Sequence, residues 1–484
     1  MRYSTWQRLL IPVLLVSSLI ASCGKDNPAP TPTPPSPDPG TPTEVPLKTQ
    51  RINRFIVEAM RNRYLWNSGL PSEIDITSES DPAALFKRLR NPQDSWSVLS
   101  DNIQQTQGEF TNETRSYGYE LTFGKFNNSE NMFAVVLFTY PDSPAAKAGI
   151  KRGDIFIRVN DMEITMNTYM NLFRFPNVSL QYGHLEGNTI YPATQTTTLT
   201  GTEMYLDPVI TYSVIDRAGH KIGYLCYSDF VSKSIGRLEE VFSTFQQQQV
   251  TEIILDLRYN PGGEVSAMAK LSSMLAPKSA VESHSVLQTR IYNKEYTEYL
   301  RQTGTDVNDY FDPSVAVNLN GLPLYTLTES STASASESLI LCLKPYMTVK
   351  QVGSSTAGKY CGGSLFQPAV QQGGQLVPDP EIGNWVLYLM TFKTADANGK
   401  SISSSGLYPD IWTSSLTLPE LKLPLGDPLD PFIAKAGHST PTRIETKSAD
   451  PGFTLLRGLT GQPETRSGWL IDSTVMIPVT GASR

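Results

Sequence analysis

The sequence has few of the residues on which many common catalytic sites depend. Only four histidines (His184, His220, His284 and His438) and four cysteines occur among 484 residues. It contains no HExxH motif and no pair of cysteines at the spacing of zinc ligands, so no metal site is expected. None of the histidines stands in a nucleophile-like context, and the sequence therefore does not support a Ser-His-Asp triad.

Positive charge is also in short supply. The chain has 40 Lys and Arg against 47 Asp and Glu, a net charge of −7 at pH 7, and no basic block. A protein without a basic surface is not expected to bind nucleic acid. Hydrophobic residues make up 39% of the chain, which is ordinary for a globular protein, and its length suffices for about three or four domains.

Long apolar runs are missing except near the start of the chain. Residues 9–20 are apolar and follow Arg2 and Arg8, but the run is too short to span a membrane and is typical of a secretory signal over residues 1–22. The signal ends in Leu-Ile-Ala-Ser-Cys, which resembles a bacterial lipobox and predicts cleavage before Cys23 and acylation of its sulfur. A simple signal peptide followed by an incidental cysteine is the alternative.

Residues 23–47 alternate proline with small polar residues and cannot pack a core. Such a segment is expected to be an extended, semi-rigid tether. With acylation at Cys23, it predicts a protein held by a lipid anchor at a membrane of the bacterial cell envelope.

A small helical domain is expected over residues 48–110. Apolar residues recur at helical spacing through residues 51–65, and Asp81-Pro82 is a typical start for a second helix ending near Arg90. The tryptophans of this region, Trp66 and Trp96, are interpreted as packing residues.

Residues 111–206 show short alternating strands with turn signals. The segment PDSPAAKAGIKRGDIFIRVN, residues 141–160, resembles the core of PDZ domains. This resemblance implies a carboxylate-binding loop whose backbone N–H groups capture the C-terminus of a peptide. The predicted peptide-binding residues are Tyr117, Gly118, Tyr119, Glu120 and Leu121. A PDZ-like module that only gates the neighbouring domain is the alternative.

Residues 207–436 alternate strands with helices, which predicts a sheet with partly parallel strands. Two of its residues could act together chemically. Ser334 follows a strand and precedes a helix, where unpaired N–H groups and the helix dipole favour a developing oxyanion. Lys359 follows after about one helix and one returning strand, and a buried lysine loses its proton readily enough to serve as a base. A Ser-rich helix cap and a solvated turn lysine would give the same pattern without chemistry.

The turn before Lys359 also imitates a phosphate-binding loop. Residues 353–359 match its first seven positions, but Tyr360 stands where a Ser or Thr must bind magnesium. Cys361-Gly362-Gly363 cannot start the helix that would hold the phosphates. No nucleotide is therefore expected.

Thr332-Ala333-Ser334-Ala335-Ser336-Glu337 and the later Gly358-Lys359 closely resemble the nucleophile and base segments of the C-terminal processing peptidases, or tail-specific proteases. Residues 255–263, LDLRYNPGG, resemble the Asp-Leu-Arg-x-Asn-x-Gly-Gly signature of the same family, and the likeness covers most of residues 50–436. Asp256 and Arg258 of this signature are interpreted as structural.

The resemblance implies a multidomain α+β fold with an N-terminal helical domain, a PDZ-like domain and a ClpP/crotonase-like α/β protease domain. Ser334 would be the nucleophile and Lys359 the general base. Ala335 and a glycine of the pair Gly262-Gly263 would supply the oxyanion hole. The family usually has a glutamine four positions after the lysine; Gly363 stands there, and Gln367 is predicted to be the displaced third catalytic residue.

Three cysteines follow Cys23. Cys226 and Cys342 lie in apolar runs and are expected to be core thiols. A disulfide between Cys342 and Cys361, or Cys361 as a nucleophile, are open alternatives with little support.

The leading hypothesis is an envelope-anchored serine endopeptidase that acts on peptides or proteins and needs no cofactor. The rival hypothesis is a catalytically weak or inactive surface lipoprotein that binds peptides. Residues 437–484 form a C-terminal extension unlike the family, either loose or packed back as strands, for which residues 469–479 are suited.

Overall fold

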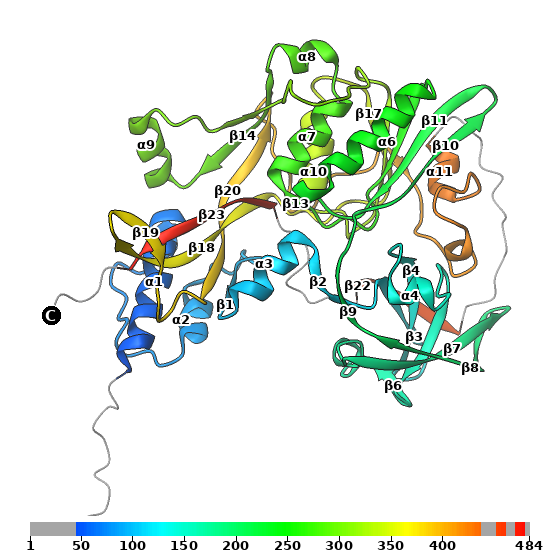
Figure 1. Cartoon of the computed structure of the whole chain (residues 1–484), viewed down its shortest axis with the longest axis horizontal. Helices are drawn as coiled ribbons and strands as arrows, with labels where there is room; N and C mark the ends of the chain where they lie inside the picture. Colours follow the sequence, from blue (N-terminus) through cyan, green and yellow to red (C-terminus); the bar gives the residue numbers. More distant parts are fainter. Residues whose placement is uncertain (1–44, 437–451, 461–469, 480–484) are drawn as a thin grey trace, which may run out of the picture. The chain divides into compact units, whose positions relative to one another are not determined.

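A computed structural model describes residues 45–436, 452–460 and 470–479 (Figure 1). The predicted signal segment, Cys23 and nearly all of the predicted tether lie outside the described residues. Within the described ranges, no helix has the length and apolar character needed to cross a bilayer. Signal cleavage and acylation therefore stay predictions.

A six-stranded sheet, called here the central sheet, forms the middle of residues 207–436. Its order is β10 (Val209–Arg217), β11 (His220–Tyr227), β12 (Glu252–Asp256), β16 (Leu324–Thr328), β17 (Val349–Gly353) and β21 (Ile411–Trp412). The β10–β11 pair is antiparallel, and the pairs from β11 to β21 are parallel. The predicted sheet with partly parallel strands is confirmed.

The two faces of the central sheet bury different partners, because successive strand residues point to opposite sides. One face is packed with helices α6 (Ile235–Gln247), α7 (Val265–Leu275) and α10 (Ala335–Leu343). Leu225 and Leu255 belong to this cluster. Tyr224 and Ile254 instead join a second cluster with Phe432 of α11 (Pro431–Lys435) and with apolar residues of the β-rich segment. The sheet is thus buried on both sides.

An eight-stranded outer sheet carries the segments around the predicted base. Its path is β13 (Gly263–Glu264), β23 (Leu470–Pro478), β18 (Cys361–Gln372), β20 (Val386–Asp396), β14 (Val286–Tyr292) and β15 (Asn308–Tyr310). Two further strands pair at its side, β1 (Val98–Ser100) with β20 and β19 (Gln375–Pro378) with β18. The sheet therefore joins segments from both ends of the chain.

The helices of the predicted N-terminal helical domain pack on the outer sheet. They are α1 (Leu47–Arg63) and α2 (Pro82–Leu89), close to their predicted limits. Phe55 and Met60 of α1 share one buried cluster with Phe366 and Leu387 of the outer sheet. Because β1 also pairs with β20, this region shares the core of the outer sheet.

The β-rich segment forms a seven-stranded sheet, called here the β-rich module. Its order is β22 (Phe453–Thr460), β3 (Tyr119–Phe126), β4 (Asn131–Thr139), β6 (Met162–Thr165), β5 (Ile155–Val159), β7 (Asn177–Glu186) and β8 (Thr189–Thr200). Two short helices and a separate pair of strands accompany it: α4 (Pro144–Lys147), α5 (Tyr169–Leu172), β2 (Glu113–Ser116) and β9 (Thr202–Tyr205). The expectation of a β-rich region is confirmed.

The described parts of the C-terminal extension, residues 452–460 and 470–479, pack back on the molecule as strands, one of the two alternatives that the sequence left open. Figure 1 shows β22 and β23 at the red end of the chain. β22 joins the β-rich module and β23 joins the outer sheet. The remaining described elements are α3 (Ile103–Thr111), α8 (Lys278–Glu282), α9 (Lys294–Thr303) and the 3-10 turns η1 (Asn67–Gly69), η2 (Ser232–Ser234) and η3 (Glu420–Lys422).

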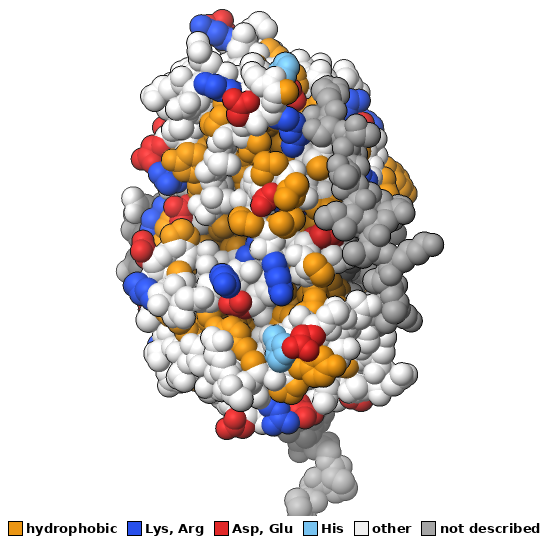
Figure 2. All heavy atoms as spheres, turned by 90° about the vertical axis from the view of Figure 1, so that its right-hand side faces the viewer, with side chains coloured by type: hydrophobic (Ala, Val, Ile, Leu, Met, Phe, Trp, Pro, Cys, Tyr) orange, Lys and Arg blue, Asp and Glu red, His pale blue; other side chains and the backbone are white. Residues whose placement is uncertain are grey.

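Charge is mixed on the face drawn in Figure 2. Lys and Arg side chains are interspersed there with Asp and Glu, and apolar side chains form patches between them. A cleft lined by one sign of charge is needed to steer a charged ligand over a distance.

A fully buried ion cluster fixes the loop after β12. The Arg258 guanidinium donates to both carboxylate oxygens of Asp256, at 2.9 and 2.6 Å, and lies 2.9 Å from Asp430. Asp430 also accepts from the N–H of Phe432 and so caps α11. Bidentate pairs of this kind fix geometry as well as charge. The cluster joins the loop to α11, as expected for structural residues.

Replacing Arg258 by Ala should lower the free energy of unfolding by about 3–5 kcal/mol, because two carboxylates would stay buried without a counter-charge. Urea unfolding measures this. Arg237→Ala is the control, since Arg237 pairs with Glu240 on the surface, and it should cost less than about 1 kcal/mol. Equal losses for the two variants would contradict the structural role of the cluster.

Candidate active site

Ser334 stands between β16 and α10, as predicted. Its φ of 62° and ψ of −112° form a backbone conformation that residues with a Cβ rarely adopt. Its side chain is buried, and the hydroxyl oxygen has no hydrogen-bond partner. A strained strand-to-helix turn is one way in which hydrolases present a nucleophilic serine.

Hydroxyl groups on both sides of Ser334 fix this turn to the loop after β12. Thr332 Oγ1 donates to the carbonyl of Leu257 at 2.8 Å. Ser336 Oγ donates to the carbonyl of Asn260 at 3.2 Å. Buried hydroxyls with carbonyl acceptors hold a loop without adding charge. The strained turn is therefore supported by the same loop that leads to the glycine pair.

The predicted oxyanion donors are the backbone N–H groups of Gly262, Gly263 and Ala335, and they differ in whether they are already engaged. Gly262 N–H donates to Asn260 Oδ1 at 2.9 Å and is already engaged. Gly263 has a φ of 133°, and a Cβ added there would lie 2.2 Å from the carbonyl oxygen of Phe230, so only glycine fits. Ala335 is the first residue of α10, and its N–H has no acceptor within the helix. Ala335 remains a candidate donor, whereas the N–H of Gly262 is occupied and Gly263 is paired with Leu470 in the β13–β23 ladder.

The side chain of Lys359 lies among aromatic rings. Its Nζ is 3.5 Å from the Tyr388 hydroxyl and 5.9 Å from the centre of the Trp96 ring. Burial lowers the pKa of Lys359 to about 8, against the opposing effect of nearby Cys361 and Asp94. Apolar surroundings disfavour the charged form of an amine. A neutral fraction near physiological pH is the property that a general base needs.

The carboxylate of Glu337 connects Ser334 with Lys359. Its Oε2 accepts the backbone N–H of Ser334 at 2.8 Å and that of Lys359 at 2.9 Å. Its Oε1 accepts the Thr356 hydroxyl at 2.5 Å and the Gly358 N–H at 2.8 Å. Burial raises the pKa of Glu337, and the four donors oppose that effect. The backbones of Ser334 and Lys359 are therefore adjacent.

The two reactive groups themselves are not hydrogen-bonded in this structure. Ser334 Oγ has no partner, and Lys359 Nζ contacts Tyr388 instead. Because both backbone nitrogens contact one oxygen, they lie within about 6 Å of each other. Lysine has several staggered rotamers, so a rotation of its side chain can bring the amine to the hydroxyl.

Gln367, predicted to be the displaced third catalytic residue, lies away from Lys359 in the structure. Its amide donates to the carbonyl of Gly383 at 2.8 Å. Gln367 lies in β18, and six strand residues at about 3.3 Å each separate it from Cys361 by roughly 20 Å. The group that contacts Lys359 comes instead from the neighbouring strand, as Tyr388 of β20.

Three residues near Lys359 and Ser334 were missed as functional by the sequence analysis. Glu337 stands in the quoted motif, and its position three residues into the helix after Ser334 is a signal that could have identified it. Trp96 and Tyr388 come from distant segments, and a lone aromatic residue gives no sequence signal of contact with a lysine.

The loop before β3 is tied to α4 rather than open. Gly118 N–H donates to Ser116 Oγ at 2.9 Å, and Gly118 O accepts from Ser143 Oγ at 3.1 Å. The Tyr117 hydroxyl donates to the carbonyl of Phe175. Tyr119 and Leu121 are buried in the β-rich module. The predicted carboxylate-binding loop is therefore ordered, with the N–H of Gly118 already engaged.

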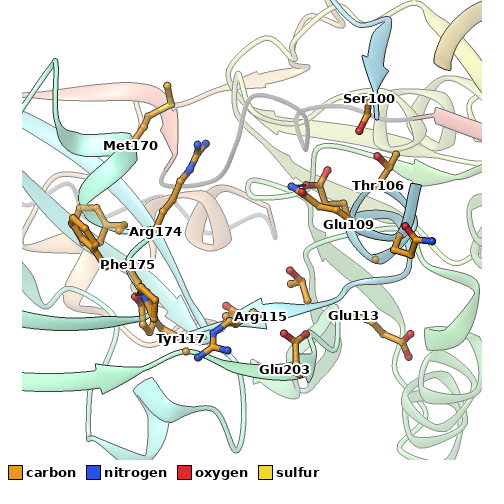
Figure 3. Close-up of a pocket in the computed structure, with 18 of the residues that line it drawn as sticks. Ser100, Thr106, Glu109, Glu113, Arg115, Tyr117, Met170, Arg174, Phe175 and Glu203 are labelled. Carbon is orange, nitrogen blue, oxygen red and sulfur yellow. Dashed lines mark hydrogen bonds between the residues drawn. The ribbon is translucent and has the colours of Figure 1, made fainter. Parts of the chain in front are cut away.

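A cavity of about 940 Å³ runs from this loop toward the lysine pocket. Tyr117 and Glu120 line one part of it, while Val386 and Tyr388 line another. In Figure 3 the Arg174 side chain extends into the open space, with Glu109 on the opposite side. The cavity thus lies between the predicted peptide-binding loop and Tyr388, the residue whose hydroxyl contacts Lys359.

The cysteines, the turn before Lys359 and possible metal ligands were the other features that the sequence singled out. Cys226, Cys342 and Cys361 are all free and buried, so the Cys342–Cys361 disulfide is not formed. Burial raises the pKa of Cys361 to about 12, which disfavours a thiolate nucleophile. The turn before Lys359 leads into strand β18 and not into a helix, as the rejection of a phosphate-binding loop requires. Among the described residues, no group of three or more possible metal ligands gathers.

Two segments match known family models. Residues 221–413 match the model described as Peptidase family S41, and residues 51–98 match the Peptidase S41 N-terminal domain. The solved structure of a putative S41 protease from Bacteroides fragilis is 26% identical, with a TM-score of 0.65 over 79% of this chain and 95% of that chain.

Curated relatives carry related names. A carboxyl-terminal-processing protease of Synechocystis is 25% identical over 58% of this chain and 64% of the relative. A carboxy-terminal-processing protease of Bartonella bacilliformis is 26% identical over 64% of this chain and 63% of the relative. The chain therefore spans less than two thirds of the length of these relatives.

Replacing Glu337 by Gln should loosen the connection between the two turns, because an amide group cannot accept all four hydrogen bonds. We expect the amides of Gly358 and Lys359 to exchange hydrogen at least about tenfold faster, with a loss of stability of about 1–3 kcal/mol. Hydrogen exchange followed by mass spectrometry measures both. Glu420→Gln is the control, since Glu420 accepts from Thr417 in an exposed turn. Unchanged exchange at residues 358 and 359 would show that Glu337 does not hold them.

Proposed function

The chain belongs to peptidase family S41, and we propose that it is a serine endopeptidase with Ser334 as nucleophile and Lys359 as general base. The observation that carries this proposal is the single Glu337 oxygen that accepts the backbone N–H of both residues. The lowered pKa of Lys359 supports it, because only a neutral amine can accept a proton.

The proposed reaction proceeds through an acyl-enzyme. Lys359 Nζ accepts the proton of Ser334 Oγ as that oxygen bonds to the peptide carbonyl carbon. The N–H group of Ala335 stabilises the oxyanion. The C–N bond breaks as the lysine ammonium returns its proton to the leaving amine. Water then attacks the ester, again losing a proton to Lys359, and the acid is released as Ser334 Oγ recovers its proton.

Lys359 must change rotamer for this reaction. Its amine contacts Tyr388 in the structure, and the Ser334 hydroxyl is unpartnered. Catalytic hydrogen bonds are often long or unformed without substrate. We propose that Tyr388 holds the amine in its resting position and that substrate binding moves it to Ser334.

Substrates are proposed to be protein or peptide chains presented by a C-terminal segment. The cavity between the Tyr117 loop and Tyr388 is suited to an extended chain. The Arg174 guanidinium projects into it and could pair with a carboxylate (Figure 3). The resemblance of residues 141–160 to PDZ domains supports backbone capture of a peptide end by residues 117–121.

Attachment to a bacterial envelope membrane through acylated Cys23 is a further part of the proposal. It rests on the lipobox-like end of the signal segment and on the Pro-rich residues that follow. The tether would hold the peptidase away from the lipid surface, in contact with unfolded or secreted chains.

A peptide-binding lipoprotein with weak or no catalysis is the second candidate. The separation of Ser334 Oγ from Lys359 Nζ favours it, as does Gly363 at the position of the usual third residue. The two candidates differ in turnover. Only the first predicts hydrolysis of casein that is lost in Ser334→Ala.

The rate of hydrolysis should follow the neutral form of Lys359. Because its folded-state pKa is lowered to about 8, kcat/KM for casein should rise by about tenfold per pH unit below pH 8 and level off above it. A steady-state pH series measures this, with Ser334→Ala as the background. A profile that is flat between pH 6 and pH 10 would rule out a titrating lysine base.

The hydroxyl of Tyr388 should influence both the rate and the pH profile. It accepts from the Lys359 amine in the resting position and so favours the charged lysine. Tyr388→Phe should therefore shift the profile midpoint to lower pH and raise kcat/KM at pH values below 8. The control is Tyr299→Phe, because Tyr299 is 55% exposed. If Tyr388→Phe keeps the parental midpoint and kcat/KM, Tyr388 has no positioning role.

A further inference from the structure

The tail of the chain provides the outermost strand of the β-rich module. β22 pairs antiparallel with β3, with Phe453 opposite Phe126 and Leu456 opposite Phe123 (Figure 1). The other edge of β3 is taken by β4. Without β22, the outer edge of β3 would expose a row of unpaired N–H and C=O groups, which is the usual template for adding a peptide strand.

The direction of β22 is the one that a captured peptide must have. The loop before β3 contains the predicted carboxylate-binding residues. A peptide whose C-terminus reaches that loop must run antiparallel to β3. β22 does so, from Phe453 opposite Phe126 at the end of β3 to Thr460 opposite Thr122 near its start. The tail therefore occupies the peptide position in the peptide direction.

Apolar side chains fix this strand on the module. The ring of Phe453 meets that of Phe133 edge to face, with 5.3 Å between ring centres. Leu456 packs against the buried cluster that contains Phe123. Leu455 packs against the cluster that contains Phe453, and Thr454, between these two residues, is exposed. Apolar residues that alternate with an exposed one are the pattern by which an added strand gains side-chain specificity.

The same tail then reaches the outer sheet beside the oxyanion loop. β23 pairs in parallel with β13, with Leu470 opposite Gly263, and with β18 on its other side. Ser334 and Lys359 are both buried in this arrangement. The tail thus engages two places at which the proposed function requires a substrate.

We propose that the outer edge of β3 is a peptide-binding site, that residues 453–460 are its resident ligand, and that a substrate strand binds by displacing them. The identity of the incoming ligand rests on the proposed function. It is an extended peptide with alternating apolar residues and a free C-terminal carboxylate.

A free C-terminus gives the incoming peptide its advantage. Thr460 lies opposite Thr122 and is followed by further residues in the sequence, so the tail has no free carboxylate at this point, whereas the C-terminus of a substrate does. A resident segment lowers the apparent affinity of a competitor, because the competitor can bind only during the fraction of time in which the site is free. The tail therefore selects for ligands that make the carboxylate contact.

Locking the tail in place tests this proposal without weakening the fold. Lys125 and Thr454 are directly opposite each other in the β3–β22 pair, where Cα separations suit a disulfide. The full chain with Lys125→Cys, Thr454→Cys and Ser334→Ala is titrated with the fluorescein-labelled peptide GFTLLRGLT, a copy of residues 452–460 with a free carboxylate. We expect the reduced form to bind it at least about tenfold more tightly than the oxidised form. The C-terminal amide of the peptide should bind more weakly than the free acid.

Releasing the tail provides the opposite test. In the Ser334→Ala background, Phe453→Ser with Leu456→Ser should tighten peptide binding at least about tenfold, whereas Thr454→Ser should leave it unchanged. Hydrogen exchange of residues 119–126 should become faster in the double variant and slow again with peptide. Exchange of β5 should stay at the parental rate, which shows that the module remains folded.

The outcomes separate this proposal from the proposed function. Equal peptide affinity of the oxidised and reduced forms would overturn the proposal, even if the parent with Ser334 hydrolyses casein. Tighter binding by the reduced form supports it, even if no form of the protein hydrolyses casein, in which case the peptidase proposal fails by itself. With Ser334 restored, casein hydrolysis at least about tenfold faster in the reduced form would support both.

Discussion

The carboxylate of Glu337 is the interaction on which the candidate site depends. It belongs to the helix that begins at Ser334, and it accepts hydrogen bonds from the segment that ends at Lys359. Charge-assisted hydrogen bonds to a buried carboxylate are among the stronger ones in proteins, and removing one partner leaves costly unsatisfied groups. One side chain therefore aligns two turns that follow different strands of the central sheet, β16 and β17.

The site gathers several features that stability alone would disfavour. Ser334 has a strained backbone, and Lys359 is an amine without a carboxylate partner in an aromatic pocket. Such features persist where the surrounding structure enforces them, and they are typical of functional sites. The buried cluster around Arg258 and the hydroxyl contacts of Thr332 supply that enforcement. The geometry that suits catalysis is thus held by residues that take no part in it.

Much of the central sheet could be predicted, because alternating apolar strands and helices leave a strong periodic signal. Ser334 was recognisable from its strand-to-helix position. The separation of Gln367 from Lys359 could not be predicted, because spacing along the sequence does not reveal that residues 361–372 form one extended strand. Tyr388 and Trp96 come from segments that are far from Lys359 in the sequence. Tyr388 lies in β20 and Trp96 just before β1, and the pairing of β1 with β20 in the outer sheet brings both segments together. The sites of β22 and β23 were not predictable, since a short strand pattern does not specify which sheet edge it joins.

The central claim is that Lys359 is a neutral amine close to Ser334 at working pH. Titration of the full chain with carbon-13 at lysine Cε, followed by NMR, measures it directly, with Lys359→Met identifying the signal. We expect one lysine resonance with a midpoint near pH 8 that is absent from the variant. A Lys359 resonance that stays in the charged form up to pH 10 would contradict the account.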